Sequence, residues 1–421
     1  MNSKFPYLLL LSTLIGCVPT AVKSPLTFQE VSLMIGNFDA ENVGLVQMIS
    51  RSPKTQFDDP IIRLGTSLTV NFDLLEDDFS YLNAKIFHCN ADWTKSQLRD
   101  LEFLTDYNEY PIRDYDFSQT LYRSYVNYRF DLPKVTRSGN YILTVFNEDN
   151  NKILFNRRFV VYETLVQTSV QVSRSVDPRL RESHHQIDYE LNYGTLNVTN
   201  PITDIETVII QNQNWNKGIF DLEPIEIRMD QQILRYGSFE NKNAIAAGTD
   251  FRIFDTRRIA NKGFNVADQY VTEKGPQVIL NTDKPRAGLS FAEPFQKDLN
   301  GLFMSSNDDF LETNFNTEYV NVNFTLDQRP ISGDIYVTGR FNNWQKNRSN
   351  QLTYDEQKNQ YFTSILMKQG YYNYNYHIVG TEVPDHYLEG SHFQTKNLYE
   401  LLVYYREPGT VFDRVVGYEA F

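Results

Sequence analysis

The amino-acid sequence predicts an all-β protein built from tandem antiparallel β-sandwiches. Apolar and polar residues alternate with a period of two along the chain, as in residues 67–74, whereas helical periodicity is nearly absent. The chain also contains 29 Phe, 27 Tyr and 3 Trp, and aromatic residues are enriched in strands. With 421 residues, its length favours two or three domains, each with its own core.

The N-terminal β-sandwich is expected over residues 26–163. Two alternating stretches, residues 139–146 and residues 154–161, flank the turn-rich residues 147–151. Strand-forming residues on both sides of a polar turn predict a β-hairpin. Because similar strands recur along the whole segment, we expect one antiparallel sandwich here.

A middle β domain is expected over residues 166–300, and a C-terminal sandwich over residues 310–421. Alternating stretches begin near residue 169, and residues 284–309 are rich in Pro, Gly, Ser and Asp, which indicates an irregular linker. Alternation resumes at residues 319–326, where the last sandwich is predicted to start.

Residues 1–17 have the pattern of a lipoprotein signal peptide that ends at a lipobox cysteine. Lys4 precedes an apolar run over residues 7–15, which is too short to span a bilayer as a helix, and Gly16 precedes Cys17. We therefore predict export, cleavage before Cys17 and lipidation of its thiol, which anchors the mature chain to a membrane. An ordinary signal peptide with a chance cysteine is the alternative.

The net charge narrows the possible partners, and the cysteine content bears on disulfide bonds. The formal net charge is −13, which argues against nucleic acid or an anionic lipid surface as a partner. Contact with a membrane is expected only through the N-terminal lipid anchor. If Cys17 is acylated, Cys89 is the one remaining cysteine, so no intrachain disulfide is expected.

Signals for catalysis or metal binding are weak. None of the six histidines belongs to a His-Glu-x-x-His arrangement, and the acidic clusters lack the spacing of a calcium loop. The sequence has no Gly-x-Ser-x-Gly elbow and no phosphate-binding glycine loop. Cys89 is predicted to be a small buried residue and not a reactive thiol. We therefore expect no enzyme activity, no catalytic or metal-binding residues and no cofactor.

One specific pattern is residues 88–93, His-Cys-Asn-Ala-Asp-Trp, where an alternating strand runs into a polar corner that ends at Trp93. Short polar side chains can satisfy loop amides that a sheet leaves free, which gives the corner a structural role. The alternative is that the corner shapes a protein-binding surface.

A second pattern lies in the C-terminal third, where residues 339–344 place Asn342 and Trp344 in a Gly-x-Phe-Asn-x-Trp turn. The turn resembles that of the early-set sandwich of glycogen- and starch-binding proteins, in which the Trp ring stacks on sugar. The chain departs from those proteins at Asn375, where they carry Lys, and after Gly380, where their second Trp is missing. The resemblance implies an Ig-like or early-set-like fold without sugar binding.

Nearly the whole mature chain, from about residue 26 to residue 418, resembles the plug protein family of the type IX secretion system. This resemblance implies a periplasmic protein that binds and closes the inner mouth of the outer-membrane translocon barrel when no substrate is in transit. It implies no catalysis, no cofactor and a protein partner. It rests on residues 88–93, 114–115 and 118, 339–344, 389–393, 395, 397, 399, 403–406, 413–414 and 416–417.

Candidate interaction residues are the three tryptophans Trp93, Trp215 and Trp344, with Asn342 of the same turn, because Trp is enriched at interface centres. A core position is the alternative for each Trp. The rival function is a glycan-binding periplasmic or surface lipoprotein that uses the Trp344 turn. Residues 18–23 lack the acidic cluster that many surface-exported lipoproteins carry, so we expect the periplasm and the inner leaflet of the outer membrane.

Overall fold

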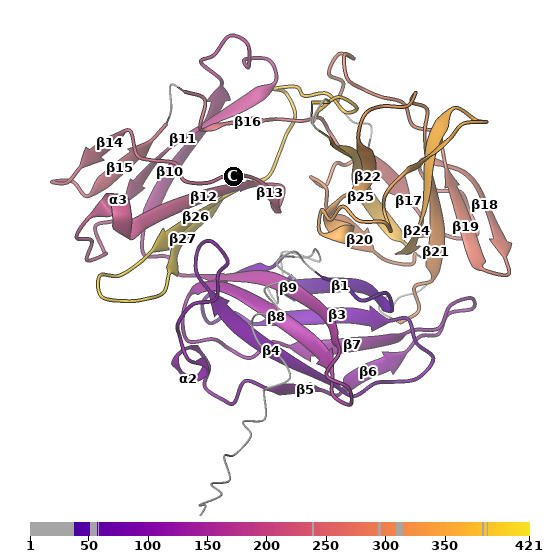
Figure 1. The fold of residues 1–421 in the computed structure, drawn as a ribbon, viewed down its shortest axis with the longest axis horizontal. Coiled ribbons are helices and arrows are strands. Elements are labelled where there is room, and N and C mark those ends of the chain that lie inside the picture. Colours follow the sequence, from indigo (N-terminus) through magenta and orange to yellow (C-terminus); the bar gives the residue numbers. More distant parts are fainter. Residues whose placement is uncertain are drawn as a thin grey trace, which may run out of the picture.

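The computed structural model describes residues 38–50, 57, 59–237, 240–293, 296–308, 315–380, 383–384 and 386–421. The signal peptide with Cys17 lies outside these residues. Over the described part the fold is all-β, as predicted, and five sheets form three lobes around a common centre (Figure 1). We name them the first lobe (residues 38–163), the second lobe (residues 164–248 and 391–421) and the third lobe (residues 249–390).

The first lobe is a sandwich of two mainly antiparallel sheets. Strands β1-β3-β7-β6 form one sheet, and β9-β8-β4-β5 with β2 form the other. The alternation predicted for residues 67–74 is seen in β3, where every second residue from Leu68 to Leu74 is buried. The expected hairpin is formed by β8 and β9. The elements are β1 (Val43–Ser50), β2 (Ile61–Arg63), β3 (Leu68–Leu74), β4 (Leu82–Cys89), α2 (Asp100–Phe103), β5 (Tyr110–Ile112), β6 (Asp114–Phe117), β7 (Val126–Asp131), β8 (Gly139–Asn147) and β9 (Ile153–Tyr162).

The second lobe packs the sheet β10-β11-β15-β14, which β16 joins through β11, against the strands β13-β12-β26-β27. Its core includes Tyr189 and Tyr236, whose rings stack with centroids 4.5 Å apart. The elements are β10 (Gln167–Arg174), β11 (His184–Asn192), α3 (Pro201–Asp204), β12 (Ile205–Gln211), β13 (Asn214–Ile219), β14 (Glu226–Arg228), β15 (Ile233–Tyr236), β16 (Ala244–Ala246), β26 (Tyr399–Tyr405) and β27 (Arg414–Ala420).

The third lobe packs β17-β25-β20 with β22 against β18-β19-β21-β24-β23. Its core is aromatic, with Phe254 stacked on Tyr372 at 5.1 Å and Phe324 set edge-on to Tyr374. The elements are β17 (Arg252–Asp255), β18 (Val266–Thr272), β19 (Gly275–Leu280), β20 (Phe303–Ser305), β21 (Tyr319–Leu326), β22 (Asp334–Thr338), the 3-10 helix η1 (Arg340–Asn342), β23 (Thr353–Asp355), β24 (Gln360–Lys368) and β25 (Gly370–Val379).

The strand pairing places two segments outside the domains expected for them, one from the middle domain and one from the C-terminal sandwich. Strand β17 pairs with β25 and β19 pairs with β21, so residues 252–280 belong to the third lobe. At the other end, β26 pairs with β12, which places residues 399–420 in the second lobe. The third lobe is therefore inserted into the second one. Alternation marks a strand but does not identify its partner, so the sequence could not show this insertion.

The first and second lobes share one nine-stranded sheet. Strand β27 lies parallel to β9 where Val415 meets Tyr162, and the backbone N–H groups of Glu163 and Leu165 donate to the carbonyls of Val415 and Val416 at 2.8 Å. These two lobes are consequently joined by backbone as well as side chains. Within the described residues, we find no helix long and apolar enough to cross a membrane.

Candidate functional site

The 88–93 corner lies where the first lobe meets the second. Trp93 is 5% exposed, its ring sits edge-on to Trp215 of β13 with centroids 5.0 Å apart, and the Arg158 guanidinium lies 4.5 Å from its centroid. The backbone N–H of Ala91 donates to the Asp413 carboxylate at 2.9 Å. The polar corner of the first lobe thus contacts the β26–β27 loop of the second lobe.

Next to this corner, strands of the shared nine-stranded sheet form a buried apolar cluster. Phe87 and Cys89 of β4 pack there with Ile210 of β12 and Leu402 of β26. Burial raises the pKa of the Cys89 thiol to about 12, so the thiol stays protonated and unreactive near neutral pH. Apolar packing, and not a disulfide bond of Cys89, holds the first and second lobes together here.

The contact between the first and third lobes is polar and buried. The Lys368 ammonium of β24 donates to the Asp73 carboxylate of β3 at 2.8 Å, and their side chains are 4% and 1% exposed. The Tyr319 hydroxyl donates to the same carboxylate oxygen at 2.7 Å, and Asn127 donates to the other oxygen at 2.7 Å. The ammonium also lies 4.4 Å from the ring centroid of Tyr125. We name this group of residues the Asp73–Lys368 joint.

Beside that joint, one carboxylate of the third lobe holds a loop of the first. Glu318 is 5% exposed, and its oxygens accept the backbone N–H groups of Leu121, Tyr122 and Arg123 at 2.9, 3.1 and 3.2 Å. The Tyr125 hydroxyl donates to the carbonyl of Thr317 at 2.9 Å. Charge-assisted bonds of this kind fix the loop backbone firmly.

The second and third lobes are joined by the two segments that connect them, which run side by side. Gly248 of the outgoing segment donates its N–H to the Ser391 hydroxyl at 2.9 Å, and its carbonyl accepts from the N–H of His392 at 2.7 Å and from the hydroxyl of Thr395 at 2.9 Å. The returning Asn397 donates to the carbonyl of Ala247 at 2.8 Å. This explains why so many short polar residues occupy 389–397.

A buried ionic group supports this junction from the third lobe. The Glu389 carboxylate accepts from Arg252 at 3.0 Å and from the backbone N–H of Tyr376 at 2.8 Å, and it pairs with Arg286 at 2.7 Å. Arg252 also pairs with Asp283 at 2.8 Å. Burial acts to raise the pKa of Glu389, but Arg252 and Arg286 outweigh it and hold the pKa at about 2.

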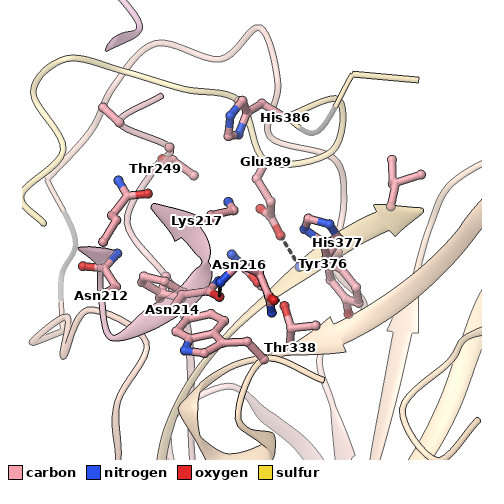
Figure 2. A pocket seen from close by; sticks show the side chains of 18 of the residues that line it. Asn212, Asn214, Asn216, Lys217, Thr249, Thr338, Tyr376, His377, His386 and Glu389 are labelled. Atoms are coloured by element: carbon pink, nitrogen blue, oxygen red, sulfur yellow. Dashed lines mark hydrogen bonds between the residues drawn. The ribbon is translucent and has the colours of Figure 1, made fainter. Parts of the chain in front are cut away.

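A pocket of about 310 Å³ opens between the second and third lobes, beside Glu389 (Figure 2). The labelled side chains come from both lobes and surround one space. The second lobe supplies the β12–β13 hairpin, whose turn residues Asn212 and Gln213 are left-handed, with φ of 55° each. The lining consists mainly of amide, imidazole and ammonium groups: Gln211, Asn212, Asn214, Asn216, Lys217, Thr249, Arg286, Thr338, Trp344, Lys346, Asn375, His377, His386, Glu389 and Asn397 among others.

The structure gives the Trp344 turn a packing role. Trp344 is 5% exposed, its ring covers Gly301 so closely that a Cβ there would collide with it, and the ring contacts Phe251. The side chain of Asn342 accepts from the N–H of Gly339 at 3.1 Å and donates to the carbonyl of Val337 at 2.9 Å. Both residues thus shape the turn itself.

The four candidate interaction residues therefore fall at two places. Trp93 and the half-buried Trp215 meet each other between the first and second lobes, whereas Trp344 and Asn342 lie in the third lobe. Their role toward a partner stays a prediction, and the structure adds an internal contact to each. Cys17 lies outside the described residues.

The sequence reasoning missed Asp73, Lys368 and Glu318. Asp73 occupies a polar position of an alternating strand, a position that predicts exposure to solvent, yet the third lobe covers it. No local signal marks such a residue. Among the residues described, no group of three or more His, Cys, Asp and Glu side chains is placed to hold a metal ion.

Residues 46–163, almost the whole first lobe, match the sequence model of the type 9 secretion system plug protein first domain. The first lobe is thus similar to the first domain of the type IX secretion plug proteins. For this part of the chain, the match confirms the family resemblance expected from the sequence. The match supports a plug-like, non-catalytic role in type IX secretion, an association with the secretion system and a location in the cell envelope.

The fold also has a counterpart of known structure. A hypothetical protein from Parabacteroides merdae ATCC 43184 is 28% identical, with 91% of this chain and 98% of that chain covered and a TM-score of 0.85. The C-terminal domain of the Streptococcus pyogenes antigen I/II-family protein AspA aligns at 8% identity over 89% of this chain and 98% of that one, with a TM-score of 0.16, so no argument rests on it. No curated protein matches the sequence.

Proposed function

We propose that this chain is a non-enzymatic periplasmic plug that binds and closes the periplasmic opening of the type IX secretion outer-membrane translocon when no substrate is present. The observation that carries the proposal is the match of the first lobe to the plug family. The three lobes support it, because each lobe contacts the other two and together they make a body wider than one sandwich (Figure 1).

A plug must be rigid yet releasable. The shared sheet, the Asp73–Lys368 joint and the paired connecting segments hold the three lobes together. Release needs only a modest binding free energy, since a dissociation constant near 10⁻⁶ M corresponds to about 8 kcal/mol. A lipid anchor at Cys17 in the inner leaflet would keep the plug near the pore and raise its effective concentration there.

The surface that we propose for the translocon contact is the loop held by Glu318. Leu121 at its tip is 88% exposed, Tyr122 is 45% exposed and the preceding Phe117 is 49% exposed. Strand β18 of the third lobe adds Tyr270, which is 51% exposed, and its hairpin with β19 comes close to Tyr122. Exposed apolar side chains on a fixed backbone form a preorganised contact surface.

The experiment is a pull-down with the tagged full-length chain, followed by mass spectrometry. We expect the translocon barrel to be recovered with the wild type and with Leu101→Asp, whose site is 76% exposed elsewhere on the first lobe, but much less with Leu121→Asp. A deletion strain should become sensitive to vancomycin, since an open pore leaks. Unchanged vancomycin sensitivity together with no recovered barrel would end the proposal.

The glycan-binding alternative is disfavoured by the position of Trp344. A ring that is 5% exposed and packed on Gly301 and Phe251 cannot form the open platform on which a sugar stacks. We expect isothermal titration with maltoheptaose to give no heat. Heat that disappears in Trp344→Ala would favour the alternative.

A further inference from the structure

We propose that a second copy of this chain binds the open edge of strand β10 in the second lobe, so that two copies form one continuous sheet about a twofold axis. Strand β10 is the last strand of the sheet β10-β11-β15-β14, and it pairs with β11 on one side only. The free N–H and C=O groups of an edge strand can bind a further strand. The proposal concerns the second lobe alone and does not require the plug function.

The other long edge strands of the molecule are less regular than β10. Among the edge strands that the structure describes, β1, β13 and β18 also have six or more residues, and the register of each with its neighbour shifts once. Such bulges twist an edge and hinder the addition of a strand. Strand β10 instead pairs with β11 over all 8 of its residues without a shift, from Gln167 opposite Asn192 to Arg174 opposite His185. Its edge is therefore both long and regular.

Strand β10 also lacks the side chains that protect other edge strands from pairing. It contains no Pro, Gly or Lys, and its one charged residue, Arg174, stands at its end and pairs with Glu182 at 2.6 Å. Val172 is 40% exposed, and Val170 is only partly buried against the core of the lobe. Sheets usually place charged residues or proline on an edge that stays unpaired. A neutral edge with an exposed valine is instead suited to pairing.

The hydrogen bonds of β11 show which backbone groups of β10 point outward. The N–H of Ile187 donates to the carbonyl of Asn243 at 3.0 Å, on the side of β16. Backbone groups of a strand alternate between its two sides, so Asp188 faces β10, where it lies opposite Gln171. Gln171 and every second residue from it therefore bond to β11. The remaining residues of β10 direct their N–H and C=O groups away from the sheet, and among them are Thr168, Val170 and Val172.

A second copy fits this edge because the edge is complementary to itself. In an antiparallel pair centred on Val170, that residue lies opposite Val170 of the second copy, and Thr168 lies opposite Val172 of the second copy. The outward groups then form about six backbone hydrogen bonds. On the other face Ser169 lies opposite Gln171, so every facing pair is uncharged, and the β-branched pairs gain contact area. A separate peptide would find no charge here to select it, whereas a second copy matches the edge at each of these positions.

Sedimentation equilibrium of the full-length chain tests for the dimer. Because one strand pair makes a small interface, we expect a dissociation constant of about 10⁻⁵ to 10⁻⁴ M. Val172→Pro removes an outward N–H but no bond to β11, so the variant should melt close to the wild type and stay monomeric. Val411→Asp, at a 52% exposed valine of the β26–β27 loop, is the control and should dimerise like the wild type. A wild type that stays monomeric at about 0.5 mM would overturn the proposal.

Paired charges on the exposed face of β10 test the register. Ser169→Lys combined with Gln171→Lys sets like charges opposite each other across the twofold axis, and Ser169→Glu combined with Gln171→Glu does the same, so each double variant should stay monomeric. Both side chains are exposed, so both double variants are expected to fold. An equal mixture should associate, because opposite charges then face each other. Failure of the mixture to associate would count against this pairing.

Hydrogen exchange locates the contact in the wild type. The outward amides of Val170 and Val172 should exchange rapidly in the monomer and more slowly as the protein concentration is raised. The amide of Gln171, which already bonds to β11, should change much less. A dimer that leaves Val170 and Val172 unprotected forms through another surface and would overturn the proposal.

Discussion

The first lobe is attached to the second by apolar surface and a shared sheet, but to the third by a few buried charges. Between the first and second lobes, Phe87, Cys89 and Trp93 pack in one apolar cluster with residues of the strands β12, β26 and β27. Between the first and third lobes, Asp73, Lys368, Tyr319 and Glu318 supply the specific contacts. The two interfaces join rigid sandwiches by opposite means.

The difference identifies the part of the molecule that can move at least cost. Separating the first and second lobes would expose a large apolar surface and break a sheet. Separating the first and third lobes would instead hydrate charged groups, whose interactions with water compensate part of the loss. We therefore expect the first and second lobes to behave as one unit, and any change of shape to occur at the third lobe.

The largest effect is expected at the Asp73–Lys368 joint. Lys368→Met removes the ammonium and leaves the Asp73 carboxylate buried without its cation, which costs about 3–5 kcal/mol. Thermal melting should shift strongly, and the amide of Leu45, which donates to the Tyr319 hydroxyl, should exchange faster. The exposed Lys358→Met, in the same lobe, is the control. If both variants melt like the wild type, the joint does not hold the lobes.

A pH-dependent effect of similar size is expected where the three lobes meet. Glu400 of β26 is 1% exposed, the Tyr418 hydroxyl donates to it at 3.0 Å, and its charged neighbours are Asp59 of the first lobe and Arg340 of the third. Burial raises the pKa of Glu400 from 4.5 to about 7. The folded state thus binds a proton that the unfolded state releases, so stability falls as pH rises from 4.5 to about 7.

Glu400→Gln removes this dependence. Its free energy of unfolding relative to the wild type should increase by about 3 kcal/mol between pH 4.5 and pH 8, since each pKa unit corresponds to about 1.4 kcal/mol. Urea unfolding of both proteins at several pH values measures this. A difference that stays constant with pH would mean that Glu400 titrates normally and is reached by water.

Local sequence patterns predicted the strands far better than their partners. The alternation at residues 67–74 and 319–326 and the hairpin at 139–161 correspond to β3, β21 and β8–β9, because one face of each strand packs on a core within its own sandwich. The insertion of the third lobe was not predictable, since pairing between distant strands leaves no local mark.

The residues at the lobe junctions likewise divide into those that the sequence marked and those that it did not. The 88–93 corner was recognisable as unusual, because short polar residues outside a strand must satisfy backbone groups, whereas the 389–397 segment was noticed only through the family resemblance. Asp73 and Lys368 were not recognisable, because each occupies a polar position of a strand and is covered by the partner lobe, the third lobe for Asp73 and the first lobe for Lys368. Burial by another lobe is a property of the assembly and not of the local sequence.

A smaller effect is expected at the apolar interface. Trp215→Ala removes the edge-on contact with Trp93, and because Trp215 is only half-buried, we expect a loss of about 2 kcal/mol, below the range for a fully buried Trp. Tyr107→Ala, at a 76% exposed aromatic of the first lobe, should change stability by less than about 0.5 kcal/mol. If Trp93→Ala and Trp215→Ala have strictly additive effects, the two rings do not couple the lobes.

The smallest effect on stability is expected at Glu318, where the joint and the proposed contact surface meet. Glu318→Gln keeps one oxygen, which can accept the N–H groups of Leu121 and Tyr122, but it replaces the oxygen that accepts from Arg123 and removes the charge, which costs about 1 kcal/mol. Hydrogen exchange should accelerate at these three amides and stay unchanged in β8. Because Leu121 itself is retained, weaker recovery of the translocon barrel by this variant would show that the rigidity of the loop matters to binding. Recovery equal to wild type, with faster exchange, would show that the exposed side chains suffice without it.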